Sequence, residues 1–298
     1  MAGWLVAARD AGRAVAGRAD LWPAGSVAVL AYLGWLPLLA VVAPTLRGSQ
    51  LILFGAGLVS ASLFPLNLFM IAAAAAALLI VACGLASLGE AAVLARLEDD
   101  AGGPSAAEGR IETGSIFAVV LVAMLPVVAA AAALLAGLAV TAPDILTSPD
   151  DGATLSTRIM GALGPYVAIL ACLLLLSQAV GAASMRRAGS GRRRLPAALR
   201  LGLMDVLRRP ARRLGIAFVT TLLDLIALVV AFALLSILWQ PIHARLADGH
   251  LLSPVTLIGL LGFVLVWLGL VLAAGAAHAW TSAWWSLELA PDRLEVAA

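Results

Sequence analysis

Residues 254–277 read PVTLIGLLGFVLVWLGLVLAAGAA, an unbroken apolar run that contains no charged side chain. A helix needs about 20 apolar residues to cross the hydrocarbon core of a bilayer, and this run exceeds that length. The composition of the whole chain agrees, because 63% of its 298 residues are hydrophobic and only 12% are charged. Soluble domains average roughly 45–50% apolar and about 25% charged residues. The sequence therefore predicts an integral membrane protein.

Five further runs resemble this one in length and composition. The six predicted spans are Ala24–Ala43, Pro65–Leu88, Gly114–Val140, Ala162–Gly181, Leu214–Trp239 and Pro254–Trp280. Backbone polar groups in lipid must be satisfied within the spanning segment, and these runs are too long for barrel strands. We expect an all-α fold, a polytopic membrane helix bundle with six transmembrane helices.

A shorter apolar stretch, Leu51–Phe64, lies between the first two predicted spans. It is too short to cross a bilayer as a helix. Three interpretations remain open: a re-entrant segment, an interfacial segment, or an extension of the second helix.

The arginines predict the orientation, because cytoplasmic loops of membrane proteins carry an excess of positive charge. All 19 basic residues are arginine, and with six spans sixteen of them fall on the side of the termini. We therefore expect both termini in the cytoplasm. The lysine-free, alanine- and leucine-rich composition suggests the inner membrane of a bacterium. Charged residues interrupt the first twenty positions, so no cleaved signal peptide is expected.

Tryptophans fall near the predicted membrane surfaces. They are Trp22, Trp239, Trp280, Trp284 and Trp285. Tryptophan is enriched at the level of the headgroups, so these positions are typical of an aromatic belt.

Three features recur at a spacing of about 92–99 residues. Prolines close the outer ends of the odd spans at Pro44, Pro143 and Pro241. Small residues mark the inner ends of the even spans at Gly89, Gly181 and Gly275. The segment that begins at Pro104 matches the one that begins at Pro196. We predict a single membrane domain, 1–298, of three repeat units, 1–95, 96–190 and 191–298, each a cytoplasmic lead-in helix followed by a helical hairpin.

The lead-in segment Leu195–Arg213 has an amphipathic pattern. One helical face carries Leu199, Leu203, Val206 and Leu207, and away from it lie Asp205, Arg208 and Arg209. Such a helix lies in the headgroup layer with its arginines toward anionic lipid. The candidate lipid contacts are Arg192, Arg193, Arg194, Arg208 and Arg209. A general positive-inside anchor explains the same arginines, so both interpretations stay open.

The same segment carries a family resemblance. The residues from Pro196-Ala197-Ala198-Leu199-Arg200 through Arg208-Arg209-Pro210, with the long aliphatic span that follows, resemble bacterial six-helix membrane domains. Those domains are sometimes fused in front of glycerophosphodiester phosphodiesterases. The likeness covers the layout of the whole chain but the motifs of only one part, and no phosphodiesterase domain is present. It implies an architecture and no chemistry.

Motifs for catalysis are absent from the sequence: no GxxxxGK[ST], HExxH or GxSxG pattern occurs. The three histidines do not form the paired intramembrane arrangement that haem ligation needs. Acidic residues gather from Glu90 to Glu112, and we interpret them as a solvated cytoplasmic loop. Within it Glu98–Asp100 is expected to approach Arg192–Arg194. The sequence predicts no enzyme, no cofactor and no metal site.

Asp224 is the ionisable residue that the spans place deepest, near the middle of Leu214–Trp239. A carboxylate at that depth is costly and by default faces protein or water. Ser177 and Gln178 of the fourth span are its candidate neighbours, so the three form a candidate intramembrane polar site. The group is either linked to a proton or substrate, or it is a hydrogen-bonded packing contact. We favour the packing contact, since no second intramembrane acid or base is evident.

These features favour a non-enzymatic membrane module: a scaffold, an accessory subunit or a lipid-interacting protein. The alternative is the permease subunit of an ATP-driven transporter, which the cytoplasmic segment before six spans also fits. The expected partners are the lipid bilayer, with its anionic lipids, and a protein partner or a second copy of the chain; nucleic acid is not expected.

Overall fold

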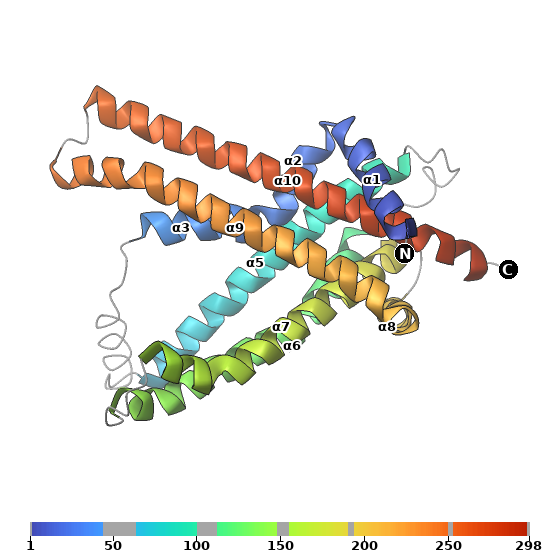
Figure 1. Ribbon diagram of the computed structural model, residues 1–298, viewed down its shortest axis with the longest axis horizontal. Helices are drawn as coiled ribbons and strands as arrows, with labels where there is room; N and C mark the ends of the chain where they lie inside the picture. The colour runs from blue at the N-terminus through green and yellow to red at the C-terminus, as the bar shows by residue number, and fades with distance from the viewer. Residues whose placement is uncertain are drawn as a thin grey trace. The chain divides into compact units, whose positions relative to one another are not determined.

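The computed structural model describes residues 2–43, 64–99, 112–147, 155–189, 194–249 and 253–296. Within these ranges the chain is helical and has no strand, which confirms the predicted all-α class (Figure 1). The helices are α1 (Ala2–Ala16), α2 (Leu21–Val29), η1 (Leu30–Trp35), α3 (Leu36–Val42), α5 (Phe64–Asp99), α6 (Thr113–Thr147), α7 (Leu155–Gly189), α8 (Leu195–Arg208), α9 (Pro210–Ala247) and α10 (Pro254–Val296).

Six helical segments in the described ranges are long and apolar enough to cross a membrane, which confirms the predicted number of spans. They are Leu21–Val42, Phe69–Leu97, Thr113–Leu134, Gly164–Ala188, Pro210–Ala247 and Pro254–Leu289. The first consists of α2, η1 and α3 in succession. The stretch Leu51–Phe64 lies outside the described residues except for Phe64, which begins α5.

Two helices continue well beyond the ends of the apolar runs. α5 passes Leu88 and ends at Asp99, and α10 passes Trp280 and ends at Val296. The residues that follow Leu88 are mainly alanine, leucine, glutamate and arginine, all good helix formers. The end of an apolar run therefore predicts where lipid contact ends. It does not predict where the helix ends.

Two prolines lie inside helices that they were predicted to end. α6 passes Pro143 and ends at Thr147, and α9 passes Pro241 and ends at Ala247. That prediction is wrong at both positions, because a proline removes one backbone hydrogen bond and bends a helix without always ending it. Pro44 lies outside the described residues.

The chain forms two compact units, Met1–Thr113 with Leu222–Ala298 (unit 1) and Gly114–Thr221 (unit 2). Unit 1 holds α1, α2, η1, α3, α5, α10 and most of α9, and unit 2 holds α6, α7, α8 and the start of α9. The three repeat units stay a prediction.

Glycines allow the helices of unit 1 to pack at backbone distance. A Cβ atom at Gly25 of α2 would collide with the backbone of Gly275 in α10. A Cβ atom at Gly89 of α5 would collide with Ala28 on α2. α2 is thereby held between α5 and α10, and close approach of this kind is the usual use of small residues in membrane helix packing.

A π-helical turn, η1, interrupts the first span between α2 and α3. The indole N–H of Trp267 in α10 donates a 2.9 Å hydrogen bond to the carbonyl oxygen of Gly34. The ring of Trp267 also contacts that of Trp35, with centroids 5.6 Å apart. α10 thus satisfies a backbone group in the irregular turn, as irregular backbone within a membrane span requires.

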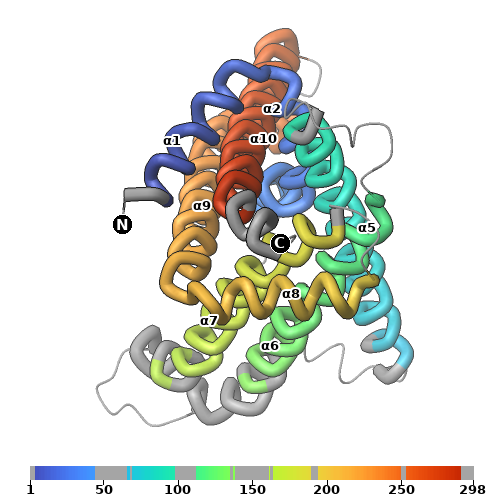
Figure 2. Tube along the Cα trace, turned by 90° about the vertical axis from the view of Figure 1, so that its right-hand side faces the viewer, coloured from blue at the N-terminus to red at the C-terminus, as the bar shows by residue number. Residues whose placement is uncertain are grey.

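Tryptophan rings join α1 to α10, and Figure 2 shows α1 lying along the C-terminal part of that helix. Trp284 stacks on Trp4 of α1 and on Trp280, with centroids 5.7 and 5.8 Å apart. The Trp280 indole donates a 2.8 Å hydrogen bond to the carbonyl oxygen of Ala8. Trp284 and Trp285 are buried in the protein, so the interpretation of these two as part of an aromatic belt is wrong.

α3 contacts the C-terminal part of α9 and the N-terminal part of α10. Val41, Leu235, Ile242 and Phe263 form a buried apolar cluster there. Trp239 packs against it with its ring centroid 5.3 Å from that of Phe263. Apolar side chains therefore make the contacts of α3 with α9 and α10, whereas α2 packs on α5 and α10 through glycines.

Unit 2 is built on the contact of α7 with α8. Val119 of α6, Ala188 of α7 and Ala198 of α8 form its apolar cluster. A Cβ atom at Gly202 of α8 would collide with Ser184 of α7, so these two helices also pack closely.

The buried face of α8 differs from the one that its amphipathic pattern predicts. Val206 is buried together with Asp205, whereas Leu203 and Leu207 are 42% and 61% exposed. The Asp205 carboxylate lies 2.9 Å from the Arg187 guanidinium of α7, and both side chains are buried. The sequence pattern placed Asp205 on the polar side, but an ion pair lets it face the protein.

Candidate functional site

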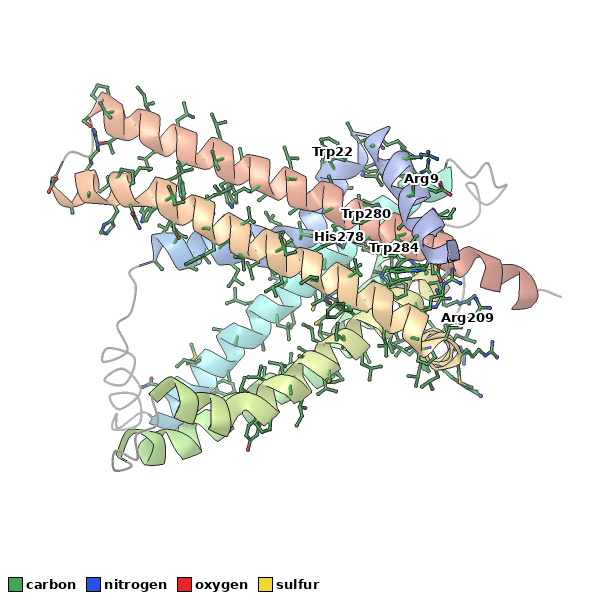
Figure 3. The ribbon with its side chains drawn as sticks, viewed as in Figure 1. Arg9, Trp22, Arg209, His278, Trp280 and Trp284 are labelled. Carbon is green, nitrogen blue, oxygen red and sulfur yellow. The ribbon has the colours of Figure 1, made fainter. Side chains whose placement is uncertain are left out.

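Polar side chains from α5 and α10 meet in unit 1 beside the glycine crossing of α2. Glu90 follows Gly89, and His278 lies one turn after Gly275. Both glycines pack against α2, and at this crossing the side chains of Glu90 and His278 are in contact. Figure 3 shows His278 on α10, before Trp280 and Trp284.

Both oxygens of the Glu90 carboxylate have a partner on α10. One oxygen lies 2.9 Å from Nε2 of His278, and the other accepts a 2.8 Å hydrogen bond from the Ser282 hydroxyl. His278 and Ser282 are four residues apart and therefore share one helix face. Glu90 is only 4% exposed and Ser282 is buried. A carboxylate removed from solvent needs such partners, because an unpaired buried charge is strongly destabilising.

Further polar side chains of α10 lie next to His278 and Ser282. The Thr281 hydroxyl donates a 2.9 Å hydrogen bond to the carbonyl oxygen of His278, and that of Ser286 donates one of 3.1 Å to Ser282. Both hydrogen bonds join a hydroxyl group to the backbone of the same helix, α10.

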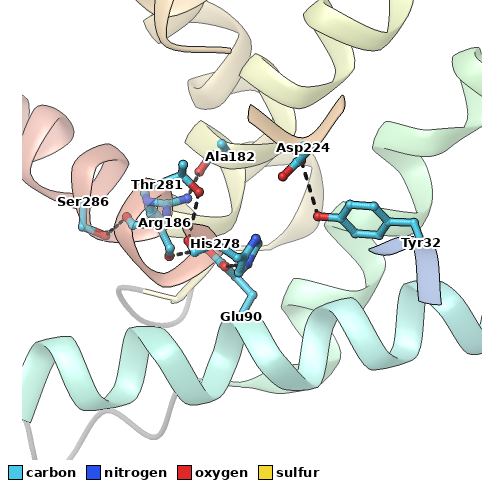
Figure 4. A network of polar contacts seen from close by, with 9 residues as sticks. Tyr32, Glu90, Ala182, Arg186, Asp224, His278, Thr281 and Ser286 are labelled. Carbon is cyan, nitrogen blue, oxygen red and sulfur yellow. Dashed lines mark hydrogen bonds and ion pairs between the residues drawn. The ribbon is translucent and has the colours of Figure 1, made fainter. Parts of the chain in front are cut away.

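A second polar pair joins η1 to α9. The Tyr32 hydroxyl lies 3.5 Å from a carboxylate oxygen of Asp224 (Figure 4). Asp224 is half-buried, and Tyr32 is 37% exposed. At 3.5 Å the hydrogen bond is long and weak.

The two pairs lie close enough for their charges to interact. His278 acts electrostatically on Asp224, and Glu90 acts on Tyr32. Four helical segments, η1, α5, α9 and α10, thus contribute one titratable side chain each to a shared polar cluster. We name Tyr32, Glu90, Asp224 and His278 the membrane cluster.

The predicted neighbours of Asp224 make their described contacts in unit 2. The Ser177 hydroxyl donates to the carbonyl oxygen of Ala123 on α6. The Gln178 side-chain oxygen accepts hydrogen bonds of 3.4 and 2.8 Å from Thr220 and Thr221 on α9. Whether Ser177 and Gln178 serve a common site with Asp224 stays a prediction.

Three of the candidate lipid-binding arginines are described, and all three are exposed: Arg194, Arg208 and Arg209. Arg192 and Arg193 lie outside the described residues. The expected approach of Glu98–Asp100 to Arg192–Arg194 involves side chains outside the description as well.

Glu90 and His278 are the functional candidates that the sequence analysis missed. Glu90 was assigned to a solvated acidic loop, and the structure shows that this is wrong for Glu90, because α5 continues through it and it is buried. The available signal was the apolar segment Ala91–Ala95, which separates Glu90 from the other acids and extends the helix past it. His278 gave no such signal, since a single histidine near a span end fits many environments.

The described residues hold no group of three or more histidine, cysteine, aspartate or glutamate side chains arranged for a metal ion. No family model, curated protein or solved structure matches the chain.

Proposed function

We propose that this chain is a non-enzymatic, multi-pass protein of a bacterial inner membrane that interacts with anionic lipids through α8. The observation that carries the proposal is the pair of opposite faces on this helix. One face packs on α7 through Gly202 and Asp205, and the other exposes Leu203 and Leu207. An apolar face that the protein leaves uncovered is what a helix at a membrane surface requires.

Basic side chains flank the exposed apolar face. Arg200 lies beside Leu207 in angle around the helix axis, on the side away from Leu203, and Arg208 follows Leu207 in the chain; both arginines are exposed. An arginine near an anionic leaflet contributes about 1 kcal/mol of attraction to the membrane. Several of them together with two leucines give the combination of charge and apolar area that binds headgroups and the adjacent acyl chains.

A fluorescent probe on α8 tests this proposal in the full-length protein. An environment-sensitive fluorophore is attached to Leu207→Cys in a chain whose Cys83 and Cys172 are replaced by alanine. The protein is reconstituted in vesicles of phosphatidylcholine alone or of equal parts phosphatidylcholine and phosphatidylglycerol. We expect a blue shift with phosphatidylglycerol that is lost when Arg200 and Arg208 are both replaced by glutamine.

The matched control is Arg245→Gln, which removes an exposed arginine near the other end of α9. It should leave the blue shift unchanged. A probe that reports the same environment in both vesicles, or a shift that Arg245→Gln abolishes equally, would contradict the lipid proposal.

A permease subunit of an ATP-driven transporter is the second candidate. It is favoured by the polar side chains among the spans of unit 1, since polar side chains within spans commonly mark a substrate or ion path. The decisive test is purification in mild detergent from the native host. A stoichiometric ATPase that is released only by harsher detergent would support the permease, and its absence would favour the lipid-interacting module.

The finer architecture belongs to the same proposal. We propose three repeated hairpins with lead-in helices, both termini in the cytoplasm, and the resemblance to the six-helix membrane domains described above. α8 precedes α9 as a lead-in helix would, and Gly89 and Gly181 each contact the preceding span of their own hairpin. Gly275 departs from this pattern, because it contacts α2 instead of α9.

A further inference from the structure

The membrane cluster contains two carboxylates that differ in how well they are held. Glu90 accepts two short hydrogen bonds and is buried. Within the described part of the chain, Asp224 has one long contact, to Tyr32, and it is half-buried. Deep in a span, a structural carboxylate is expected to be fixed by several short hydrogen bonds, and Asp224 is not fixed in this way.

We propose that the membrane cluster is a proton-binding site in which Asp224 takes up and releases the proton beside the hydrogen-bonded Glu90–His278 pair. The step is reversible and balanced: the carboxylate of Asp224 and one proton form the neutral acid. The site does not depend on the proposed lipid contact of α8.

Tyr32 is suited to both states of Asp224. A phenol is a donor and an acceptor, so Tyr32 can donate to the carboxylate and accept from the protonated acid without moving far. η1 positions this side chain, and π-helical turns occur often at functional sites. The hydrogen bond from Trp267 to Gly34 anchors that turn two residues after Tyr32.

The groups around Asp224 couple its charge to the rest of the cluster. Tyr32 faces it from η1 and His278 acts on it from α10, while Glu90 of α5 holds His278 and acts on Tyr32. The contacts of Asp224 and Glu90 therefore connect four helical segments around one proposed proton-binding group. The sequence alone shows no second ionisable group beside Asp224 within the spans, whereas the structure brings Glu90 and His278 into the same cluster.

Infrared difference spectroscopy of the full chain in lipid nanodiscs tests the proposal. Spectra recorded between alkaline and acidic pH should contain the carbonyl band of a protonated carboxyl group in an apolar environment. Asp224→Asn should abolish that band, and the matched control Asp248→Asn, which changes an exposed aspartate just after α9, should preserve it. His278→Gln should move the midpoint of the band by about one pH unit, a tenfold change in proton affinity.

Folding of each variant is verified by size-exclusion chromatography and circular dichroism. If Asp224→Asn does not fold, Tyr32→Phe replaces it, because this variant keeps the ring and removes only the hydroxyl group; it should also shift the midpoint. A wild-type spectrum without the band, a band that survives Asp224→Asn, or a midpoint that neither Tyr32→Phe nor His278→Gln changes would overturn the proposal.

Discussion

The Glu90 carboxylate joins α5 to α10 through His278 and Ser282, so its replacement should weaken unit 1. Glu90→Leu removes the acceptor of both contacts and should lower the free energy of unfolding by about 1–3 kcal/mol. Glu90→Gln should lower it less, because the amide can still accept from Ser282. Denaturant titration in mild detergent measures both. Asp10→Leu, at an exposed carboxylate of α1, is the control, and an equal loss in Asp10→Leu and Glu90→Leu would contradict the assignment.

Asp20 gives the chain a pH-dependent contact outside the spans. Two hydrogen bonds from Arg18, of 3.3 and 3.0 Å, lower the pKa of Asp20 below its usual 3.8, and the charge of Arg96 acts in the same direction. A lowered pKa means that the contact stabilises the fold above pH 3.8 and is lost as the pH falls below that value. Thermal unfolding of wild type and Asp20→Asn should therefore differ at neutral pH and converge in acid. A difference that persists unchanged at low pH would show that Asp20 acts through something other than its charge.

The candidate site shows which residues a sequence can locate. Asp224 was identified because its position deep in an apolar run is visible from the chain alone. Glu90 and His278 were missed because each lies near a span end, where an ionisable residue is unremarkable until its partner is known. Their pairing depends on the crossing of α2 with α5 and α10, a contact between segments far apart in the chain that no local pattern encodes.

Gly89 and Gly84 lie on the same helix and test whether close packing at α2 stabilises unit 1. A Cβ atom at Gly89 would collide with Ala28, whereas one at Gly84 would meet no neighbouring atom within 4 Å. Gly89→Ala should lower stability by about 1–3 kcal/mol, as overpacking does. Gly84→Ala should be neutral or stabilising, because alanine is the better helix former by about 1 kcal/mol. The thermal unfolding midpoints of the two variants report the difference, and a similar loss in both would argue against the crossing.

The spans were predicted well and their surroundings less well, for a physical reason. Apolar length decides whether a segment can cross a bilayer, and this is written in the sequence at each span. The inward face of α8 is decided by its neighbour α7: Gly202 fits against Ser184, and Arg187 compensates the charge of Asp205. Helical periodicity alone therefore predicted the wrong buried face of α8, because the contact with α7 decides which face is buried.

The number of spans and the distribution of arginines together predict the membrane topology of the chain. Six helical segments can cross the membrane, and six crossings place both termini on one side. With six crossings, sixteen of the 19 arginines would share that side, and this excess of positive charge predicts that it is the cytoplasm. The proposals for lipid contact at α8 and proton binding in unit 1 both assume that the chain is embedded in this way.

Cysteine accessibility in intact cells tests that embedding most directly. Single cysteines replace Ser148 and Asp248 on the predicted outer side, and Ser105 and Ser190 on the cytoplasmic side, in a chain that lacks Cys83 and Cys172. Asp248 is chosen because it is exposed, whereas the next residue, Gly249, has a φ of 79° that favours glycine. A membrane-impermeant maleimide added outside should label Ser148→Cys and Asp248→Cys, and should label Ser105→Cys and Ser190→Cys only after the cells are opened. Labelling of Ser190→Cys from outside would contradict the orientation, and unequal labelling within either pair would contradict the six-span topology.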